Sequence, residues 1–413
     1  MRRLVDKKNV RFLVYLCSAI YFVSYMTRIN YAAVMVEIIA RLKISEAEAV
    51  MAVTASSVSY GTGQLISGYL GDKMQAWKII LCGLIITTAM NVLIPFCATP
   101  YLMAGVWFVN GFAQAMMWPP IVKIMSSMLS EDDYKAGCIR VSQASSVARI
   151  LMYIVAPAII FVADWTFVFF FSASLSFIMC FVWIKGFKAS EKKLVQISSN
   201  DVKKEIMQDG KHEKFTWKVL LILGIVMFTI VIQGALRDSV EGWMPTYVKE
   251  TFNLGSEISI LTSVALPILS IVCFQFASLL NRKLIKNEIT CIAVTFGVGM
   301  LSALVLAVFG QMSVAIAILF AAILNAVIHG VNFFQTCLVP IYFARYGKVS
   351  FISGLLNSCT YIGSAVATYG IALVAGKFGW SAVTYIWVAI AALGMVLAGI
   401  MIKTWNKFKK GNI

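Results

Sequence analysis

Three residues near the N-terminus place a charge and two aromatic rings inside a long apolar stretch. Tyr21, Tyr25 and Arg28 are spaced i, i+4 and i+7, so two phenols and a guanidinium share one face of a helix. An arginine in hydrocarbon costs from about 3 to more than 10 kcal/mol, so this face must turn toward protein or water, where it can bind an anion. The alternative is that Arg28 extends to the lipid headgroups, but Ile29 to Met35 continue the apolar segment beyond it.

The composition of the chain indicates that its environment is a membrane. Of its 413 residues, 60% are hydrophobic and 13% are charged, which matches no class of soluble protein. Segments of about 20 apolar residues, the length that crosses about 30 Å of hydrocarbon, recur throughout, so the sequence predicts an all-α membrane protein. The twelve predicted transmembrane helices are 10–38, 48–70, 76–97, 101–128, 136–162, 165–184, 217–245, 257–280, 289–310, 313–342, 350–375 and 380–402.

A long polar segment divides these twelve helices six and six. Residues 186–216 are predicted to form a cytoplasmic linker between an N-terminal bundle, 1–185, and a C-terminal bundle, 217–413. Arg28 lies in the first segment and Arg237 in the seventh. Two pseudo-symmetric six-helix bundles, related by an axis along the membrane normal, would bring these arginines to face each other across a central cavity.

The net charge of +16 comes from an excess of basic residues, and most of these lie on one side of the predicted membrane segments. Twenty-seven of the 35 Lys and Arg residues fall at the termini, in the even-numbered connections or at the segment ends beside them, four fall on the opposite side, and four lie deeper within segments. This is the positive-inside pattern of a multi-pass protein of the cell membrane with both termini in the cytoplasm. The excess charge therefore faces the lipid bilayer, and we expect no nucleic-acid partner.

The second segment ends in a run of glycines and charges from Gly68 to Lys78. This run resembles the cytoplasmic signature of the major facilitator superfamily, in which a small-residue turn and an acid-base cluster latch the helices around the second and third spans. The match is good at Gly68, Asp72 and Lys73, which the resemblance identifies as gating residues.

Three further motifs together resemble the organophosphate:phosphate antiporters of that superfamily, such as the glycerol-3-phosphate and hexose-phosphate transporters. They are the Tyr-x-x-x-Tyr-x-x-Arg ending at Arg28, the Gln-x-Met-x-Trp-Pro-Pro beginning at Gln114, and the run from Arg237 to Tyr247. The resemblance covers most of the chain and implies the major facilitator fold, with Arg28 and Arg237 clamping a phosphate from the two halves. The tyrosines that it implies for the cavity wall are Tyr21, Tyr25, Tyr60 and Tyr361.

The chain departs from this family at two cavity positions. A lysine four residues after the tyrosine matching Tyr60 is Gln64 here, and a histidine of the fifth span corresponds to Ser146. Arg149 follows on the same helical face and is a candidate to replace part of the lost charge. The alternative for Arg149 is a structural ion pair or a hydration site.

The tenth segment carries two further candidates for substrate contact. His329 and Asn332 share one helical face, and the family places a cavity tyrosine close to His329. The alternatives are an inter-helix hydrogen bond for Asn332 and a satisfied buried imidazole for His329.

These residues predict a monomeric secondary transporter of a phosphorylated or similar organic anion, exchanged for inorganic phosphate by alternating access. Two guanidiniums offer the forked donors that suit such anions. One alternative is a proton- or sodium-coupled symporter of the same fold, with Asp238, Glu241 and Glu37 as its candidate carboxylates. Another is a membrane sensor that binds the solute without transporting it. The sequence shows no nucleophile-base pair, metal cluster or phosphate loop, so we expect no enzyme, metal or cofactor.

Overall fold

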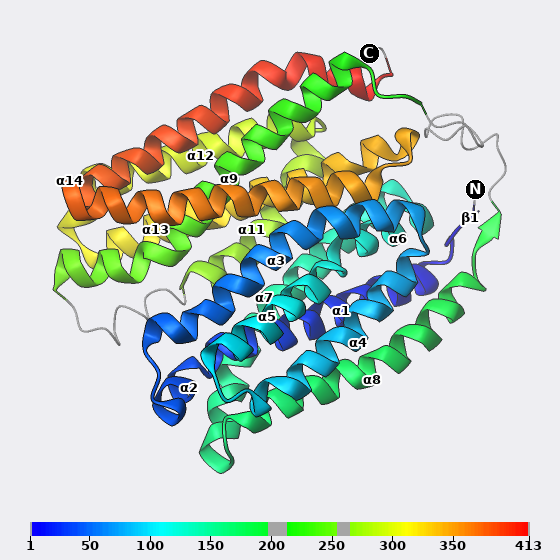
Figure 1. Ribbon diagram of the computed structural model, residues 1–413. Helices are drawn as coiled ribbons and strands as arrows, with labels where there is room; N and C mark the ends of the chain where they lie inside the picture. Colours follow the sequence, from blue (N-terminus) through cyan, green and yellow to red (C-terminus); the bar gives the residue numbers. More distant parts are fainter. Residues whose placement is uncertain (1, 197–212, 254–264, 412–413) are drawn as a thin grey trace. The chain divides into compact units, whose positions relative to one another are not determined.

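The computed structural model describes residues 2–196, 213–253 and 265–411, and this part of the chain is helical apart from one pair of two-residue strands (Figure 1). The chain divides into two compact units. The first comprises 1–212 with 343–358, and the second 213–342 with 359–413. Eight of the described helices are long and apolar enough to cross a bilayer.

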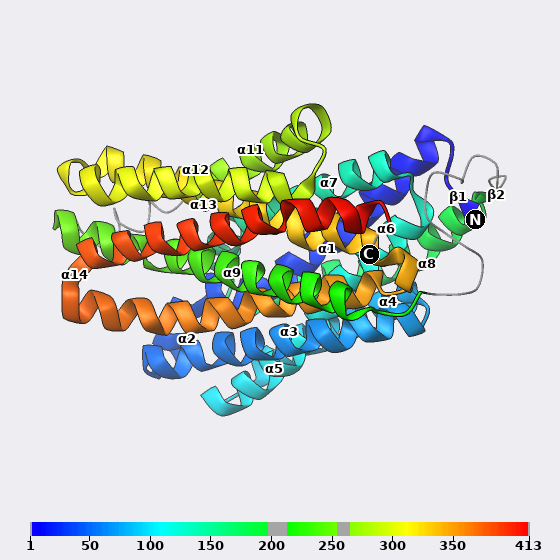
Figure 2. The ribbon, with the colours of Figure 1, turned by 90° about the horizontal axis from the view of Figure 1, so that it is seen from above.

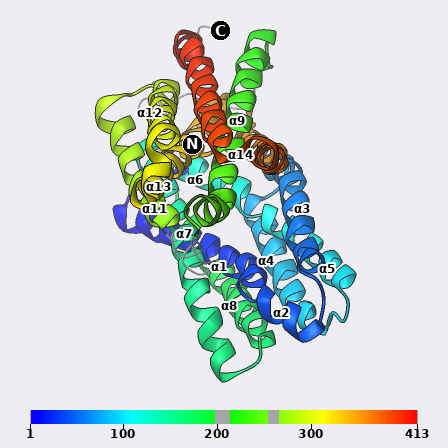
Figure 3. The same ribbon diagram turned by 90° about the vertical axis from the view of Figure 1, so that its left-hand side faces the viewer.

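The first unit consists of helices that follow one another with short connections. Seen end-on, α1 packs against α7 and α8, α3 packs against α5, and α4 contacts both α5 and α8 (Figure 3). The helices of this unit are α1 (Lys7–Ala33), α2 (Met35–Leu42), α3 (Glu46–Lys73), α4 (Ala76–Leu93) with the 3₁₀ turn η1 (Ile94–Phe96), α5 (Pro100–Ala115), α6 (Trp118–Met128), α7 (Glu131–Val162) and α8 (Thr166–Glu191).

The expected single segment 101–128 is two helices. Helix α5 ends at Ala115 and α6 begins at Trp118. Pro119 and Pro120 have no amide hydrogen to donate to the preceding turn, so they interrupt a continuous helix but fit the first turn of a new one.

A short strand pair joins the N-terminus to the end of α8. β1 (Arg2–Arg3) pairs antiparallel with β2 (Val195–Gln196), and the Leu4 amide donates to the Met128 carbonyl at 2.8 Å. The N-terminus and the beginning of the expected linker therefore lie at the same end of the first unit, and residues 197–212 of that linker lie outside the described residues.

The second unit contains the remaining helices. Helix α13 packs against α11, α12 and α9 (Figure 2). The elements are α9 (Trp217–Phe252), α11 (Ala265–Leu279), the π-helix η2 (Leu280–Leu284), α12 (Glu288–Phe309), the 3₁₀ turn η3 (Gly310–Met312), α13 (Val314–Phe333), the π-helix η4 (Phe334–Leu338), the 3₁₀ helix η5 (Val339–Tyr346) and α14 (Val349–Lys409). The end of η5 and the beginning of α14, residues 343–358, belong to the first unit.

Helix α14 is two expected segments in one helical run. Gly379 has φ 75° and ψ 176°, a conformation that L side chains rarely adopt, and it separates residues 350–375 from 380–402. With α1 and α2 counted together and α5 and α6 counted together, the described helices correspond to the expected segments, although residues 257–264 of the eighth lie outside the described residues. The expected all-α membrane fold is confirmed.

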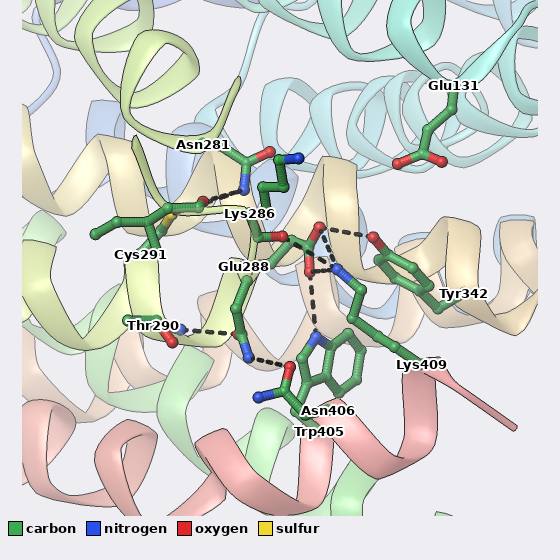
Figure 4. A network of polar contacts seen from close by, with 12 residues as sticks. Glu131, Asn281, Lys286, Glu288, Thr290, Cys291, Tyr342, Trp405, Asn406 and Lys409 are labelled. Carbon is green, nitrogen blue, oxygen red and sulfur yellow. Dashed lines mark hydrogen bonds and ion pairs between the residues drawn. The ribbon is translucent and has the colours of Figure 1, made fainter. Parts of the chain in front are cut away.

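One end of the second unit is held by a buried carboxylate (Figure 4). Glu288, at the first turn of α12, is fully buried, and its oxygens accept from Tyr342 at 2.6 Å, from the Trp405 indole at 3.2 Å and from the Lys409 ammonium at 2.8 Å. A carboxylate at a helix N-terminus is also stabilised by the helix dipole. This cluster joins α12, the segment after α13, and the end of α14, and sequence analysis did not single it out.

Helices α9 and α14 approach so closely that only glycine fits at their crossing. A Cβ atom at Gly234 would meet the Thr360 carbonyl oxygen, and one at Gly363 would meet the Val231 carbonyl oxygen, both well inside van der Waals contact. The crossing fixes α14 beside the part of α9 that carries Arg237.

We expect Gly234→Ala to destabilise the protein by about 1 to 3 kcal/mol, because the added methyl group forces α9 and α14 apart. Gly224→Ala on the same helix is the matched control, since a Cβ atom there meets nothing within 4 Å and alanine favours a helix by about 0.5 to 1 kcal/mol. Thermal unfolding in detergent measures both. Equal unfolding temperatures for the two variants would contradict the close crossing.

Candidate substrate site

The guanidinium of Arg28 lies among aromatic rings in the first unit. Its Cζ atom is 3.9 Å from the centroid of the Tyr60 ring on α3 and 5.7 Å from that of Tyr25 on its own helix. Tyr21 continues this wall, with its ring 5.1 Å from that of Tyr25 and 5.0 Å from that of Trp118. The structure therefore brings together four of the residues predicted for substrate binding. Aromatic faces stabilise a partly desolvated cation while its N–H edge still serves as a forked donor to an oxyanion.

A buried polar network fixes the helix that carries Arg28. The Thr27 carbonyl accepts from the Asn91 and Asn110 amides, each at 3.2 Å, and the Thr27 hydroxyl accepts from Gln114 at 2.8 Å. Asn30 donates to Asn91 at 2.6 Å. All of these side chains are fully buried. They tie α1 to α4 and α5 beside Arg28.

The spacing of these residues was a signal that sequence analysis did not use. Polar residues recur every three or four positions on otherwise apolar helices: Ser24, Thr27 and Asn30 on α1, Thr87 and Asn91 on α4, and Asn110 and Gln114 on α5. Ser24 and Thr87 complete the network through Gln114. Such networks are costly when any member is left unsatisfied, so they fix one helix register.

The two positions where the chain departs from its apparent family differ in environment. Gln64 on α3 is fully buried, and neither end of its amide has a hydrogen-bond partner among the described residues. Ser146 and Arg149 are both half-buried on α7, which packs against α1. Gln64 is therefore a polar group available to a ligand or water, and the proposed compensation by Arg149 stays a prediction.

Two of the three residues predicted to act in gating, Gly68 and Asp72, lie at one contact between helices, and Lys73 does not take part in it. The Asp72 carboxylate accepts from the Ser350 amide at 3.0 Å and the Phe351 amide at 2.8 Å, at the first turn of α14. A Cβ atom at Gly68 would lie 2.7 Å from the Ser350 carbonyl oxygen, so glycine permits this approach. Lys73 instead bonds the Tyr69 hydroxyl of its own helix.

The cation beside Asp72 is Lys123 of α6, whose Nζ atom lies 3.3 Å from the carboxylate. The latch therefore joins α3 and α6 to the beginning of α14, whereas the sequence motif suggested the helices around the second and third spans. A carboxylate at a helix N-terminus accepts orphan amides and is favoured by the helix dipole.

In the second unit, Arg237 is held by the next residue of its own helix. Its Nε and Nη2 atoms donate to the two Asp238 carboxylate oxygens at 2.5 and 3.0 Å. The Ser364 hydroxyl on α14 also bonds Asp238, and Tyr361 is close enough to Arg237 to interact with it electrostatically. One turn further along α9, Glu241 lies 4.0 Å from the Nε2 atom of His329 on α13. Arg237, Tyr361 and His329 thus belong to one charged cluster.

Asn332 lies outside this cluster. Its amide donates to the Gln233 side chain at 3.2 Å, and Gln335 donates to Thr229 at 2.7 Å, so polar residues of α13 hold α9. For Asn332 the structure shows the inter-helix hydrogen bond that was the alternative to substrate contact.

Comparison with known proteins fits this geometry. The model of the Major Facilitator Superfamily matches residues 17–368. The chain belongs to this superfamily. The relatives of this chain are named as transport proteins or membrane sensors and not as enzymes, as the sequence predicted. A human organic anion transporter, MFSD10, has the same superfamily fold, with a TM-score of 0.71 at 11% identity, covering 95% of this chain and 100% of its own.

Two curated relatives within the superfamily bear on the predicted substrate. A probable hexose phosphate transport protein of Chlamydia muridarum is 23% identical over 94% of this chain and 89% of its own length. The membrane sensor protein UhpC of Escherichia coli is 26% identical over 27% of this chain and 26% of its own. The first relative matches the organophosphate resemblance, and the second matches the sensor that was the alternative to a transporter.

We expect Arg28→Lys and Arg237→Lys each to abolish transport while leaving the protein folded and inserted. Lysine keeps the charge but loses the planar fork that binds an oxyanion through two N–H groups. Uptake into proteoliposomes measures the loss. Arg140→Lys is the control, because Arg140 is exposed and lies over the Tyr15 ring at 5.5 Å. Near-normal uptake by either of the first two variants would rule out a two-arginine clamp.

We expect Asp72→Asn to slow turnover about tenfold or more and to leave solute affinity nearly unchanged, since hydrogen bonds to a charged group contribute about 1.5 to 3 kcal/mol. Lys123→Gln should act in the same direction, and Lys73→Gln should have little effect. Binding by thermal shift and uptake rates separate affinity from turnover. A collapse of affinity in Asp72→Asn would place this residue in the substrate site instead.

Proposed function

We propose that the chain is a secondary transporter that moves a phosphorylated organic solute across the cell membrane in exchange for inorganic phosphate. The observation that carries this proposal is one arginine in each unit, each on a helix that can span the membrane and each beside candidate ligand-binding side chains. Forked guanidinium donors match the oxygens of a phosphate group. The hexose phosphate relative, which matches nearly the whole chain, supports the same substrate class.

The charge of the substrate supports exchange. A negative-inside membrane potential opposes the entry of an anion by about 2.3 kcal/mol per charge per 100 mV, and the exit of another anion largely cancels that cost. We propose alternating access as the route, with the six-helix halves 1–185 and 217–413 joined by the linker 186–216. The proposed topology places both termini in the cytoplasm, and the proposed working unit is a monomer.

Two other functions share the same sequence features. A proton- or sodium-coupled symporter would need a titratable carboxylate, and Asp238 and Glu241 lie in the charged cluster of the second unit. A sensor would bind the solute and signal without carrying it, as the name of the UhpC relative indicates for that protein. The aromatic wall around Arg28 is compatible with all three functions.

Reconstitution with and without internal phosphate separates these functions. We expect proteoliposomes loaded with inorganic phosphate to take up labelled phosphate from outside, and unloaded ones to take up much less. External glucose 6-phosphate should compete for this uptake, and unphosphorylated glucose should not. A symporter would fill unloaded vesicles equally well, and a sensor would bind phosphate without any uptake. Either result would contradict the exchange proposal.

A further inference from the structure

Gln64 is a buried polar residue of the first unit that the packing of the helices leaves without a partner. Its side chain lies on α3 with no exposed surface, and neither the nitrogen nor the oxygen of its amide has a hydrogen-bond partner among the described residues. Leaving both ends of a buried amide unpaired is unfavourable, and such groups are few in native proteins. This amide therefore marks a place that the polar group of a ligand can complete.

Two other buried glutamines show what such a residue does when it joins helices. Gln114 of α5 donates to the Thr27 hydroxyl of α1 at 2.8 Å, and Gln233 of α9 accepts from the Asn332 amide of α13 at 3.2 Å. Gln64 makes no bond of this kind to a described residue, although α3 packs against both α5 and α6. Helix packing alone therefore does not account for an amide at this position.

Gln64 lies one helical turn from the ring that covers Arg28. Tyr60 and Gln64 are four residues apart on α3, so their side chains project from the same face, and the Tyr60 ring centroid lies 3.9 Å from the Arg28 Cζ atom. The aromatic wall holds a second buried polar group without a partner among the described residues, the indole N–H of Trp118, whose ring lies 5.0 Å from that of Tyr21. Unpaired polar groups of α3 and α6 thus accompany the guanidinium of α1.

The polar groups of this cluster differ in what they can bind. Arg28 and Trp118 have only N–H donors, whereas the Gln64 amide has N–H donors and a carbonyl acceptor side by side. The described Asp and Glu residues of the first unit all lie at a helix end or within one turn of it, so none of them supplies an acceptor deep inside these membrane helices. A carboxylate there would also repel an anion, whereas a neutral amide oxygen accepts a hydrogen bond without carrying a full negative charge.

We infer that Gln64 determines specificity for a phosphate group that still carries a hydrogen atom. The P–O–H group donates to the Gln64 carbonyl oxygen, a charged oxygen of the same phosphate accepts from the Gln64 amide nitrogen, and the forked N–H groups of Arg28 donate to the remaining oxygens. A fully deprotonated oxyanion has no hydrogen to donate and leaves the buried carbonyl oxygen unpaired. This inference rests on the proposed function and names the form of phosphate that the site takes.

A lysine at this position, which the sequence resemblance would place there, does the opposite. An ammonium group has three donors and no acceptor, so it attracts any oxyanion and favours none that carries a hydrogen atom. Glutamine gives up that charge and adds a hydrogen bond that only a ligand with a donor can complete. The substitution of lysine by Gln64 thus exchanges attraction for discrimination.

Two ligands of equal charge test this inference in the full-length protein. In mildly alkaline buffer, hydrogen phosphate and monofluorophosphate are dianions of similar size, but only hydrogen phosphate has an O–H group. Thermal shift measures both affinities for the wild type, Gln64→Met, Gln64→Lys and the control Thr62→Val, whose exposed hydroxyl bonds carbonyls of its own helix at 3.0 and 3.2 Å. The wild type and the control should bind hydrogen phosphate about 5- to 150-fold more tightly, the effect of one buried hydrogen bond left unmade.

This preference should disappear in both variants of Gln64, for different reasons. Methionine lacks the acceptor, so the affinity of hydrogen phosphate should fall toward that of monofluorophosphate. Lysine donates to either anion, so the affinity of monofluorophosphate should rise toward that of hydrogen phosphate. Each ratio is taken within one variant, so a general loss of stability leaves it unchanged. A Gln64 variant that keeps the wild-type ratio, or a Thr62→Val protein that loses it, would overturn the inference. If neither Gln64 variant folds, a wild type without the preference overturns it.

Exchange in proteoliposomes separates the inference from the proposed function. Monofluorophosphate should compete weakly with labelled phosphate for uptake by the wild type. Phosphate exchange that monofluorophosphate inhibits as strongly as unlabelled phosphate does leaves the proposed function standing and removes the role of Gln64. A wild type that neither binds nor exchanges phosphate contradicts both.

Discussion

A guanidinium that lies among apolar helices has lost most of its water, and each half of this chain replaces that water differently. In the first unit, aromatic rings face Arg28, with Tyr60 at 3.9 Å. In the second unit, the Asp238 carboxylate binds Arg237 through two N–H groups. Aromatic faces stabilise a cation without competing for its N–H edge, whereas a carboxylate occupies that edge. The described contacts of the two arginines therefore differ in kind, with aromatic rings beside Arg28 and a carboxylate beside Arg237.

The two arginines are positioned by different kinds of packing. Helix α1 is held by a fully buried polar network that meets at Thr27, next to Arg28, and each amide in it has a partner. Helix α9 is held by the glycine crossing at Gly234 and Gly363, which depends on the absence of side chains. A polar network specifies one register because every alternative leaves amides unsatisfied, and a glycine crossing specifies one by steric fit.

The sequence was sufficient for the helical membrane fold. Apolar length predicted the membrane segments, and the cost of an arginine inside an apolar helix is the reason to expect a site at Arg28, which stays a prediction. The helical spacing of Tyr21, Tyr25 and Arg28 also placed them together correctly. The break between α5 and α6 could have been predicted from Pro119 and Pro120, because adjacent prolines cannot lie within a helix interior.

Partners distant in the sequence could not be predicted. Asp72 binds amides 278 and 279 residues away, and Glu288 binds Lys409 at a separation of 121 residues. Nothing local distinguishes Lys123 from Lys73 as the cation beside Asp72, since either lysine is long enough to reach a neighbouring carboxylate. Such choices are decided by which helices pack together, and the spacing of residues along the sequence does not specify that.

The pairing of Arg237 also bears on the proposed exchange of one anion for another. Exchange is obligatory when the empty carrier cannot close, and the physical obstacle is a desolvated cation without a counter-charge. Because Asp238 neutralises Arg237 within α9, that obstacle does not arise from the second unit. The described contacts of Arg28 with Tyr25 and Tyr60 are cation–π contacts, worth about 0.5 to 2 kcal/mol each. An unpaired charge in the second unit is therefore not what would make the proposed exchange obligatory, because Arg237 and Asp238 form a neutral pair there.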